Sequence, residues 1–471
     1  MSARLLLSGR PNTPPLSKEG NSNTPATTQA SDQEFSSIPL IQPVQASFPP
    51  RSGSIPIVPG FEIPFVEADQ VLQEYVTFML PQFPFVPLPC HNAYDMFKDK
   101  PLLLKTILRV CRPPKPEASA AFESRLRQHI AHQTVVLANK SLELVQTILV
   151  FLAWNNIYFY AACKDTSLLQ LAIGLVGDLG LNKPRRPVNS TFASIVEDAA
   201  QLRNDLPPQP KQTSDEYSTD PLLVNLVRLQ NIAAKVNDAF WETIEVSNDG
   251  VHRKFYSIAV ASIRRELDDF MQQLPDHLKW NHLLRSHGAA LRIRLFEPFK
   301  HGDSSDVLEN TQLRCRTMWD CLESTQALCD AFRSVPVESY PSLTFVSILH
   351  LALAIIKDFR LLSVEDRGWD LETVRTIYNL PEVLRQLSKL FGAASCLGSP
   401  RCAIVLHGRP IFAEYAEAYR SIERWYLSTL NPGVAPADPA MIGDIVAHGG
   451  GQYEGFEFWN QLWEFAYGLA P

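Results

Sequence analysis

Apolar side chains between Lys140 and Arg186 recur with the spacing of two helices joined by a turn. From Leu142 to Trp154 they occupy almost every position around a helix, which is typical of a helix buried on all sides. Ser141 is a favourable N-cap for this helix, and Glu143 places a carboxylate near its positive end. We expect this helical hairpin to be the core around which the rest of the chain is arranged.

The second helix of the hairpin is predicted from one apolar stripe that follows a cap at Thr166 or Ser167. Its members recur at helical spacing and are Leu168, Leu171, Ala172, Leu175, Val176 and Leu179. Gly174 and Gly177 lie within this helix, where small residues are expected to permit close approach of another backbone. Gly180 suits the left-handed position that follows a helix end.

Similar periodicity predicts helices along most of the remaining chain. Their expected spans are 65–80, 102–110, 122–139, 222–236, 256–271, 283–296, 313–332, 343–362, 371–390 (interrupted at Pro381) and 411–430. Val135, Val136, Val227 and Ile258 are among the side chains expected to face inward. No stretch shows the sustained alternation of a hairpin-rich sheet. The predicted fold class is therefore all-α, an irregular multi-helix regulatory domain with a disordered N-terminal tail.

Composition divides the chain into three parts. Residues 1–60 contain ten prolines and ten serines, a composition that predicts the disordered tail. Residues 61–430 are expected to form the helical domain, with an internal proline-rich linker at about 187–220. Residues 431–471 are expected to combine a linker with an acidic and aromatic C-terminal segment.

Net charge, cysteine content and uncharged stretches indicate which cellular compartment and which kinds of partner the sequence favours. The formal net charge of −7 argues against broad, unspecific nucleic-acid binding by the body of the protein. The eight cysteines include no C-x-x-C pair, which favours reduced thiols in the cytosol or nucleus. Twenty residues between Glu143 and Lys164 carry no charge, the length of a membrane span. Asn155 and Asn156 near the middle of that run favour a buried helix and no membrane.

Three cysteines and three histidines lie near enough in the sequence to be candidate metal ligands. A binuclear zinc cluster needs six closely spaced cysteines, whereas Cys315, Cys321 and Cys329 are separated by six and eight positions on one predicted helix. They are interpreted as core or surface residues. The histidines His277, His282 and His287 are five positions apart, which predicts different helix faces. No metal site is predicted.

Catalytic patterns are also incomplete. Asp268 and Asp269 invite comparison with the magnesium motif of all-helical terpene cyclases, but Gln272 stands where that motif has a third acid. The segment His448–Gly451 resembles an esterase oxyanion loop, but the G-x-S-x-G elbow that such enzymes need is missing from the sequence. We therefore predict no catalytic residue, no cofactor and no enzymatic activity.

Two further features each allow two interpretations. Lys183, Arg185 and Arg186 alternate with prolines and suit an exposed turn or a weak nuclear-import signal. From Tyr453 onward, aromatic residues mix with glutamates, as in activation segments that dock into coactivator grooves. The alternative is a terminal helix that packs its apolar face on the domain.

A series of short motifs follows in order over residues 60–471. They are Leu149–Trp154, Leu171-Ala172, Leu175-Val176, Asp178–Asn182, Asp220–Ala233, Leu274-Pro275, Ile293–Pro298, Gly368-Trp369-Asp370 with Val374-Arg375, and Phe458-Trp459. This series resembles the middle regulatory region of the fungal binuclear zinc-cluster transcription factors. The resemblance implies a nuclear regulator of transcription, often of a nutrient pathway or a secondary-metabolite gene cluster.

The DNA-binding cysteines of that family precede this region, and residues 1–60 contain no cysteine. The resemblance therefore implies contact with DNA only indirectly or through a missing module. The expected partners are other transcription regulators or coactivators, and a homodimer is allowed. The alternatives are a helical ligand-binding or scaffold protein and, third, an all-helical magnesium-dependent enzyme.

Overall fold

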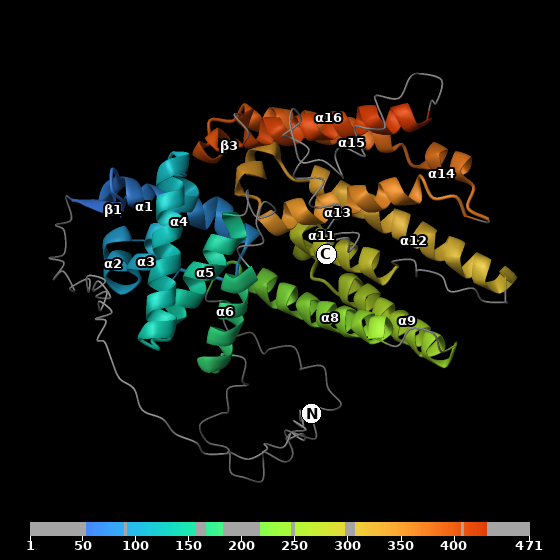
Figure 1. The fold of residues 1–471 in the computed structure, drawn as a ribbon, viewed down its shortest axis with the longest axis horizontal. Coiled ribbons are helices and arrows are strands. Elements are labelled where there is room, and N and C mark those ends of the chain that lie inside the picture. The colour runs from blue at the N-terminus through green and yellow to red at the C-terminus, as the bar shows by residue number, and fades with distance from the viewer. Residues whose placement is uncertain are drawn as a thin grey trace, which may run out of the picture. The chain divides into compact units, whose positions relative to one another are not determined.

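The computed structural model describes residues 53–88, 92–155, 166–181, 217–245, 250–296, 307–366, 368–406 and 409–430. These residues are mainly helical, and their strands form two short antiparallel hairpins, which confirms the predicted all-α class (Figure 1). Buried apolar side chains gather in three clusters: a first core within residues 55–175, a middle core within 222–295 and a C-terminal core within 289–426. None of the described helices is long and apolar enough to cross a membrane.

The first core begins with a hairpin and continues through helices. Its elements are β1 (Ser54–Val58), β2 (Phe61–Pro64), α1 (Phe65–Glu74), the π-turn η1 (Tyr75–Met79), the 3₁₀ turn η2 (Leu80–Gln82), α2 (Ala93–Asp99), α3 (Pro101–Cys111), α4 (Pro116–Ala131), η3 (His132–Val136), α5 (Leu142–Trp154) and α6 (Thr166–Asp178). Ile55 and Ile57 of β1 are buried, so the ordered part begins before residue 61, the predicted start. The rest of the predicted tail, residues 1–52, lies outside the described residues.

The helical hairpin is confirmed at its ends. α5 and α6 begin and end where the periodicity predicts, and the Ser141 hydroxyl accepts a hydrogen bond from the Leu144 amide at 3.3 Å. Gly180 has a φ of +68°, the left-handed conformation expected after α6. Glu143 was expected to act at the start of its own helix. Its carboxylate instead accepts a hydrogen bond from the Leu102 amide at 2.7 Å, so it caps the start of α3.

Two further expectations for the hairpin are wrong. A Cβ at Gly174 or Gly177 would meet nothing within 4 Å among the described residues, so neither glycine marks a close helix approach. The hairpin also organises only the first core. The C-terminal core has its own helices, and the closest packing there is between α15 and α16.

Val135 and Val136 point outward, against the expectation. After α4 the chain continues into the π-turn η3, where the Leu137 amide donates to the His132 carbonyl five residues earlier. At about 100° per residue, even a regular helix that buries Leu126 and Ile130 places Val135 about 140–180° and Val136 about 80–120° around from them. Val135 is consequently 76% exposed and Val136 68% exposed.

The middle core is formed by a pair of long helices and a shorter one. Its elements are α8 (Asp220–Glu245), α9 (Gly250–Gln272), α10 (Asp276–Lys279) and α11 (His282–Leu295). The expectation that Val227 and Ile258 face inward is wrong, because both are exposed. In α8 the buried stripe runs through Leu226 and Leu229, and Val227 lies about 100° around the helix from Leu226.

The C-terminal core contains the remaining elements. They are α12 (Val307–Arg333), η5 (Val337–Ser342), α13 (Phe345–Leu361), α14 (Leu371–Ile377), α15 (Leu380–Ser395), η6 (Pro400–Ala403), β3 (Val405–Leu406), β4 (Arg409–Pro410) and α16 (Ile411–Leu430). The predicted span of α16 is confirmed. Pro381 lies in the first turn of α15, after the Asn379 cap, so it starts a helix. In Figure 1, α15 and α16 run alongside one another.

Candidate functional site

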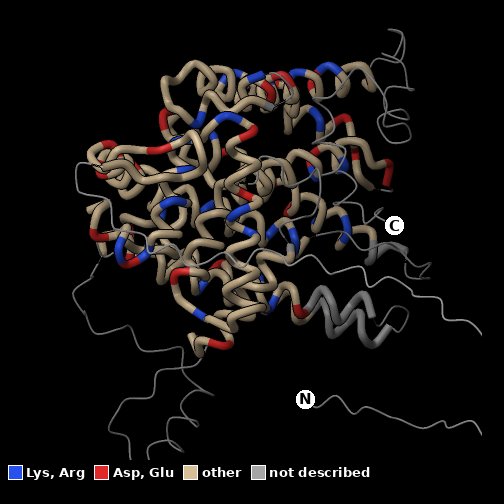
Figure 2. Tube along the Cα trace, turned by 60° about the vertical axis from the view of Figure 1, so that its left-hand side comes forward, with Lys and Arg blue, Asp and Glu red and all other residues tan. Residues whose placement is uncertain are grey.

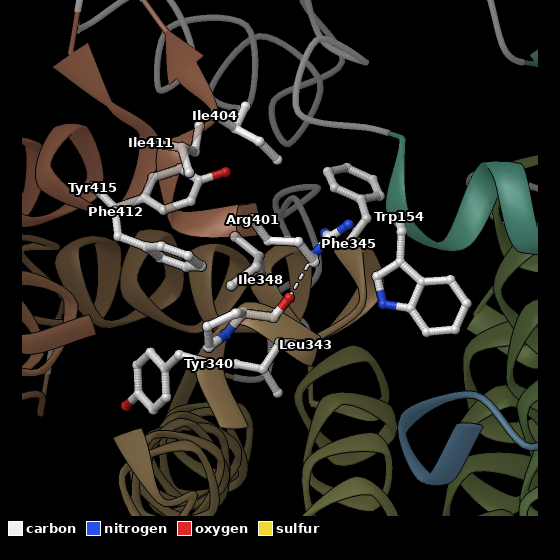
Figure 3. A pocket seen from close by; sticks show the side chains of 11 residues that line it. Trp154, Tyr340, Leu343, Phe345, Ile348, Arg401, Ile404, Ile411, Phe412 and Tyr415 are labelled. Atoms are coloured by element: carbon white, nitrogen blue, oxygen red, sulfur yellow. Dashed lines mark hydrogen bonds between the residues drawn. The ribbon is translucent and has the colours of Figure 1, made fainter. Parts of the chain in front are cut away.

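A pocket of about 40 Å³ lies where the first core meets the C-terminal core (Figure 3). Its walls come from elements far apart in sequence: α5, η5, α13, η6 and α16. The lining is mostly apolar and includes Trp154, Phe345, Ile348, Ile411 and Tyr415. Arg401 supplies the charged group of the lining. An apolar pocket with a few convergent polar groups is the usual form of a small-molecule site.

Trp154 fixes the side of the pocket that belongs to the first core. It is the last residue of α5, and its indole Nε1–H donates to the Ser342 carbonyl of η5 at 3.0 Å. Its ring makes edge-to-face contacts with Tyr75 and Phe83, at centroid separations of 5.7 and 5.8 Å. These contacts hold η5 against the first core and leave one edge of the indole to line the pocket.

Arg401 joins three elements at the same place. From η6, its Nε–H donates to the Pro341 carbonyl at 2.5 Å, and its Nη1 donates to the Val110 carbonyl of α3 at 2.8 Å. The residue keeps some exposed surface, while burial of the guanidinium lowers the pKa of Arg401 to about 10. Among the described residues no carboxylate forms an ion pair with it. The pocket thus contains a partly solvent-accessible guanidinium whose hydrogen bonds, among the described residues, go to two backbone carbonyls.

The pocket chemistry suits binding. Burial raises the pKa values of the Tyr340 and Tyr415 hydroxyls well above their usual range, so neither tyrosine serves as a base near neutral pH. The described residues that line the pocket include no cysteine, histidine or carboxylate. A cation above apolar walls can hold an anionic head group without transferring a proton or forming a covalent bond.

Asp358 forms a second buried polar cluster, in the C-terminal core. Its carboxylate accepts hydrogen bonds from the hydroxyl of Tyr378, at 2.5 Å, and from that of Thr325. Burial raises the pKa of Asp358 to about 7, and the two hydrogen bonds oppose that rise. The side chain is fully buried and does not line the Arg401 pocket, which favours a structural role.

The histidines considered as metal ligands are not brought together. His282 bonds to the Gln82 side chain at 2.8 Å, and His277 lies on α10. His287 contacts His350 of α13 edge to face, at a centroid separation of 4.7 Å. Burial lowers the pKa values of these two to about 4 and about 3, so both are neutral at physiological pH. No group of three His, Cys, Asp or Glu in the described ranges is arranged to hold a metal.

The cysteines and acidic residues that the sequence offered as possible metal ligands are buried in a core, paired with arginine or exposed. Cys321 and Cys329 are fully buried in the C-terminal core, in agreement with the prediction, and the described cysteines are free thiols. Asp268 pairs with Arg292 of α11 at 2.6 Å, and Asp269 is exposed. Because arginine already neutralises Asp268, the pair of acids does not resemble a magnesium site. Three further features lie outside the described residues: Lys183–Arg186, His448–Gly451 and the segment 453–471.

Charged residues are mixed over the described chain. Basic and acidic positions alternate along the elements, without a long stretch of one sign (Figure 2). Several arginines are already paired across elements, such as Arg264 with Asp320 and Arg112 with Glu74.

With fold and site described, the chain can be compared with known proteins. No family model matches it, and no solved structure matches it. The curated proteins that do match are named as fungal transcription factors.

The chain is 24% identical over 367 residues to "Transcription factor opdL" of Penicillium oxalicum, a match covering 68% of this chain and 64% of that protein. It is 24% identical over 348 residues to a transcription factor of Aspergillus terreus, covering 69% and 56%. "Transcription factor himD" of Aspergillus japonicus is 24% identical over 311 residues, covering 57% and 51%. The chain thus matches between about half and just under two thirds of the length of these relatives.

Proposed function

We propose that the protein is a nuclear regulator of transcription that controls a pathway-specific or secondary-metabolite gene cluster. The similarity to three fungal transcription factors over 57–69% of the chain is the observation that carries this proposal. The all-α scaffold and the absence of a catalytic arrangement among the described residues agree with a regulatory role. The Arg401 pocket gives that scaffold a place where a small molecule could act.

In this proposal the described helices act through protein contacts, with other transcription regulators or coactivators as partners. Basic and acidic positions are interspersed along the described backbone, which supports indirect contact with DNA, because phosphate binding needs concentrated lysine and arginine. Sequence-specific contact with DNA is assigned to another module or to a partner protein.

A tethering experiment tests the regulatory role. The full chain is fused to the DNA-binding domain of an unrelated factor and placed before a reporter gene. We expect reporter output to change severalfold, in either direction, relative to that DNA-binding domain alone. The Phe391→Ala variant, in which the C-terminal core is expected to be strongly destabilised, is the matched control and should weaken the effect. An intact, nuclear fusion protein that leaves the reporter unchanged contradicts the proposal.

The Arg401 pocket favours one second candidate, a helical ligand-binding protein without a role in transcription. A protein confined to the cytosol and a silent reporter, together with measurable ligand binding, would support this candidate. The all-helical magnesium-dependent enzyme has no such support, since Asp268 is already paired with Arg292 at 2.6 Å.

A further inference from the structure

We propose that the outer face of α6 packs against α6 of a second copy of this chain, so that two copies pair around a two-fold axis. The outer face is the side of α6 turned away from α5, and it carries Leu169, Ile173, Gly174 and Gly177. This inference does not rest on the proposed role in transcription, because pairing is a property of the purified chain.

The first observation is that α6 is apolar on two sides. Leu168, Ala172 and Leu175 are buried in the first core, where α6 packs on α5. Leu169 and Ile173 lie about 100–140° around the helix from Leu168. They are 45% and 57% exposed. A helix that is apolar on most of its circumference is normally covered on more than one side, so the outer face of α6 lacks a cover among the described residues.

Exposed apolar side chains are concentrated around this face. Among the described residues, seven of the nineteen exposed large hydrophobic residues fall within 135–181. An ion pair between Lys140 and Asp178 at 2.9 Å brings the segment before α5 beside the end of α6 (Figure 1). Each of the seven exposes on the order of 100 Å², so together they approach the roughly 800 Å² that one partner contributes to a standard interface. They are Val135, Val136, Leu137, Leu142, Leu169, Ile173 and Leu181.

The charge of this face restricts what can cover it. Residues 166–181 contain one charged side chain, Asp178, and it is already paired with Lys140. A nucleic acid, an acidic peptide or a basic peptide would therefore find no group of opposite charge on the helix. A membrane-surface helix carries lysine and arginine beside its apolar face, and residues 166–181 have neither. A second copy brings the same uncharged surface, so no like charges are opposed on pairing.

The shape of the face is self-complementary. Leu169 and Ile173 form a ridge, and the two glycines beside it leave a hollow, because a Cβ at Gly174 or Gly177 would meet nothing within 4 Å among the described residues. Helices pack by placing the ridge of one in the groove of the other. Around a two-fold axis each copy supplies both features, which is the isologous contact of most dimers. Ile173 lies near the middle of α6, so it is expected close to the axis.

Sedimentation velocity of the purified full-length chain tests the pairing. We expect a species of twice the 52.9 kDa chain mass that dissociates on dilution. A chain that remains monomeric at about 100 µM overturns the proposal, because an interface of standard size gives a dissociation constant well below that concentration.

Variants locate the interface. Ile173→Glu places two carboxylates near the axis and should weaken pairing at least about tenfold. The matched control is Val227→Glu, which puts the same charge at another exposed valine, on α8, and should leave pairing unchanged. Mixing Ile173→Glu with Ile173→Lys chains should restore pairing, since opposite charges then meet across the axis.

Gly177→Leu separates pairing from folding. The new side chain meets nothing in the described chain, and leucine favours a helix more than glycine does, so the thermal stability of the single chain should not fall. Pairing should weaken, because the hollow is filled. Wild-type pairing in Ile173→Glu or Gly177→Leu, or equal loss in Val227→Glu, refutes the α6 interface, whatever the reporter fusion shows.

Discussion

Replacing Phe391 by alanine is expected to lower the free energy of unfolding by about 3–5 kcal/mol. Phe391, on α15, is fully buried at the centre of an aromatic cluster in the C-terminal core. Ring centroids of five other aromatic residues lie 5.4–6.2 Å from its own: Phe332, Tyr340, Phe412, Tyr415 and Tyr419. Alanine would leave a cavity where α12, η5, α15 and α16 meet, and rings held by several elements cannot all move in to fill it.

Urea denaturation followed by circular dichroism measures this loss. The matched control is Phe78→Ala, because Phe78 lies on the π-turn η1 and is 55% exposed. Its replacement should cost well under half as much, since little apolar surface leaves water there on folding. Equal losses for the two variants would show that the aromatic cluster is not the centre of the C-terminal core.

Replacing Asp358 by asparagine is expected to change the pH dependence of stability more than any other single substitution considered. Burial raises the pKa of the Asp358 carboxyl from 3.8 to about 7. Between these two values the folded chain binds a proton that the unfolded chain has released, so stability falls as pH rises. The stability linked to the Asp358 proton is fully present below about pH 4 and is lost by about pH 7. Its total size is on the order of 4 kcal/mol.

The Asn variant removes this titration while keeping a polar group between the Thr325 and Tyr378 hydroxyls. Unfolding free energies measured from pH 4.5 to 8 should therefore decline for the wild type relative to Asp358→Asn, and the variant should be the more stable at pH 8. Cys329 and Tyr378, the titratable neighbours, have pKa values raised well above their usual range and stay neutral throughout. Asp358→Ala is the control, because it leaves two buried hydroxyls without an acceptor and should destabilise at every pH. If the unfolding free energies of wild type and Asp358→Asn changed in parallel with pH, the raised pKa of the buried Asp358 carboxyl would be contradicted.

Local patterns in the sequence were sufficient for much of the fold. The stripe from Leu168 to Leu179 and the Ser141 cap depend on neighbours within one or two turns, and the structure confirms both. The prediction for Val135 was wrong because the spacing was misread. At about 100° per residue, Val135 lies about 180° around the helix from Leu126 and about 140° from Ile130, so a strict helical count places it opposite the core.

The candidate site could not be predicted in the same way. Arg401 reaches the Val110 carbonyl across 291 positions of sequence, and Trp154 reaches Ser342 across 188. Such pairs are set by tertiary packing, and a lone arginine in a proline-containing loop carries no pattern that distinguishes it from a surface residue. The contact between His287 and His350 was missed for the same reason, because the two rings come from different helices. The surroundings of Arg401, with no acidic partner among the described residues, become visible only when the packing is known.

The central claim is that this chain regulates transcription, and transcript profiling of a strain that lacks its gene tests this claim most directly. Transcripts should be compared between that strain, its parent and a strain with the gene restored. We predict severalfold changes concentrated in a set of neighbouring or pathway-related genes, reversed when the gene is restored. A deletion strain in which every transcript, including those of the neighbouring genes, matches the parent would contradict the account.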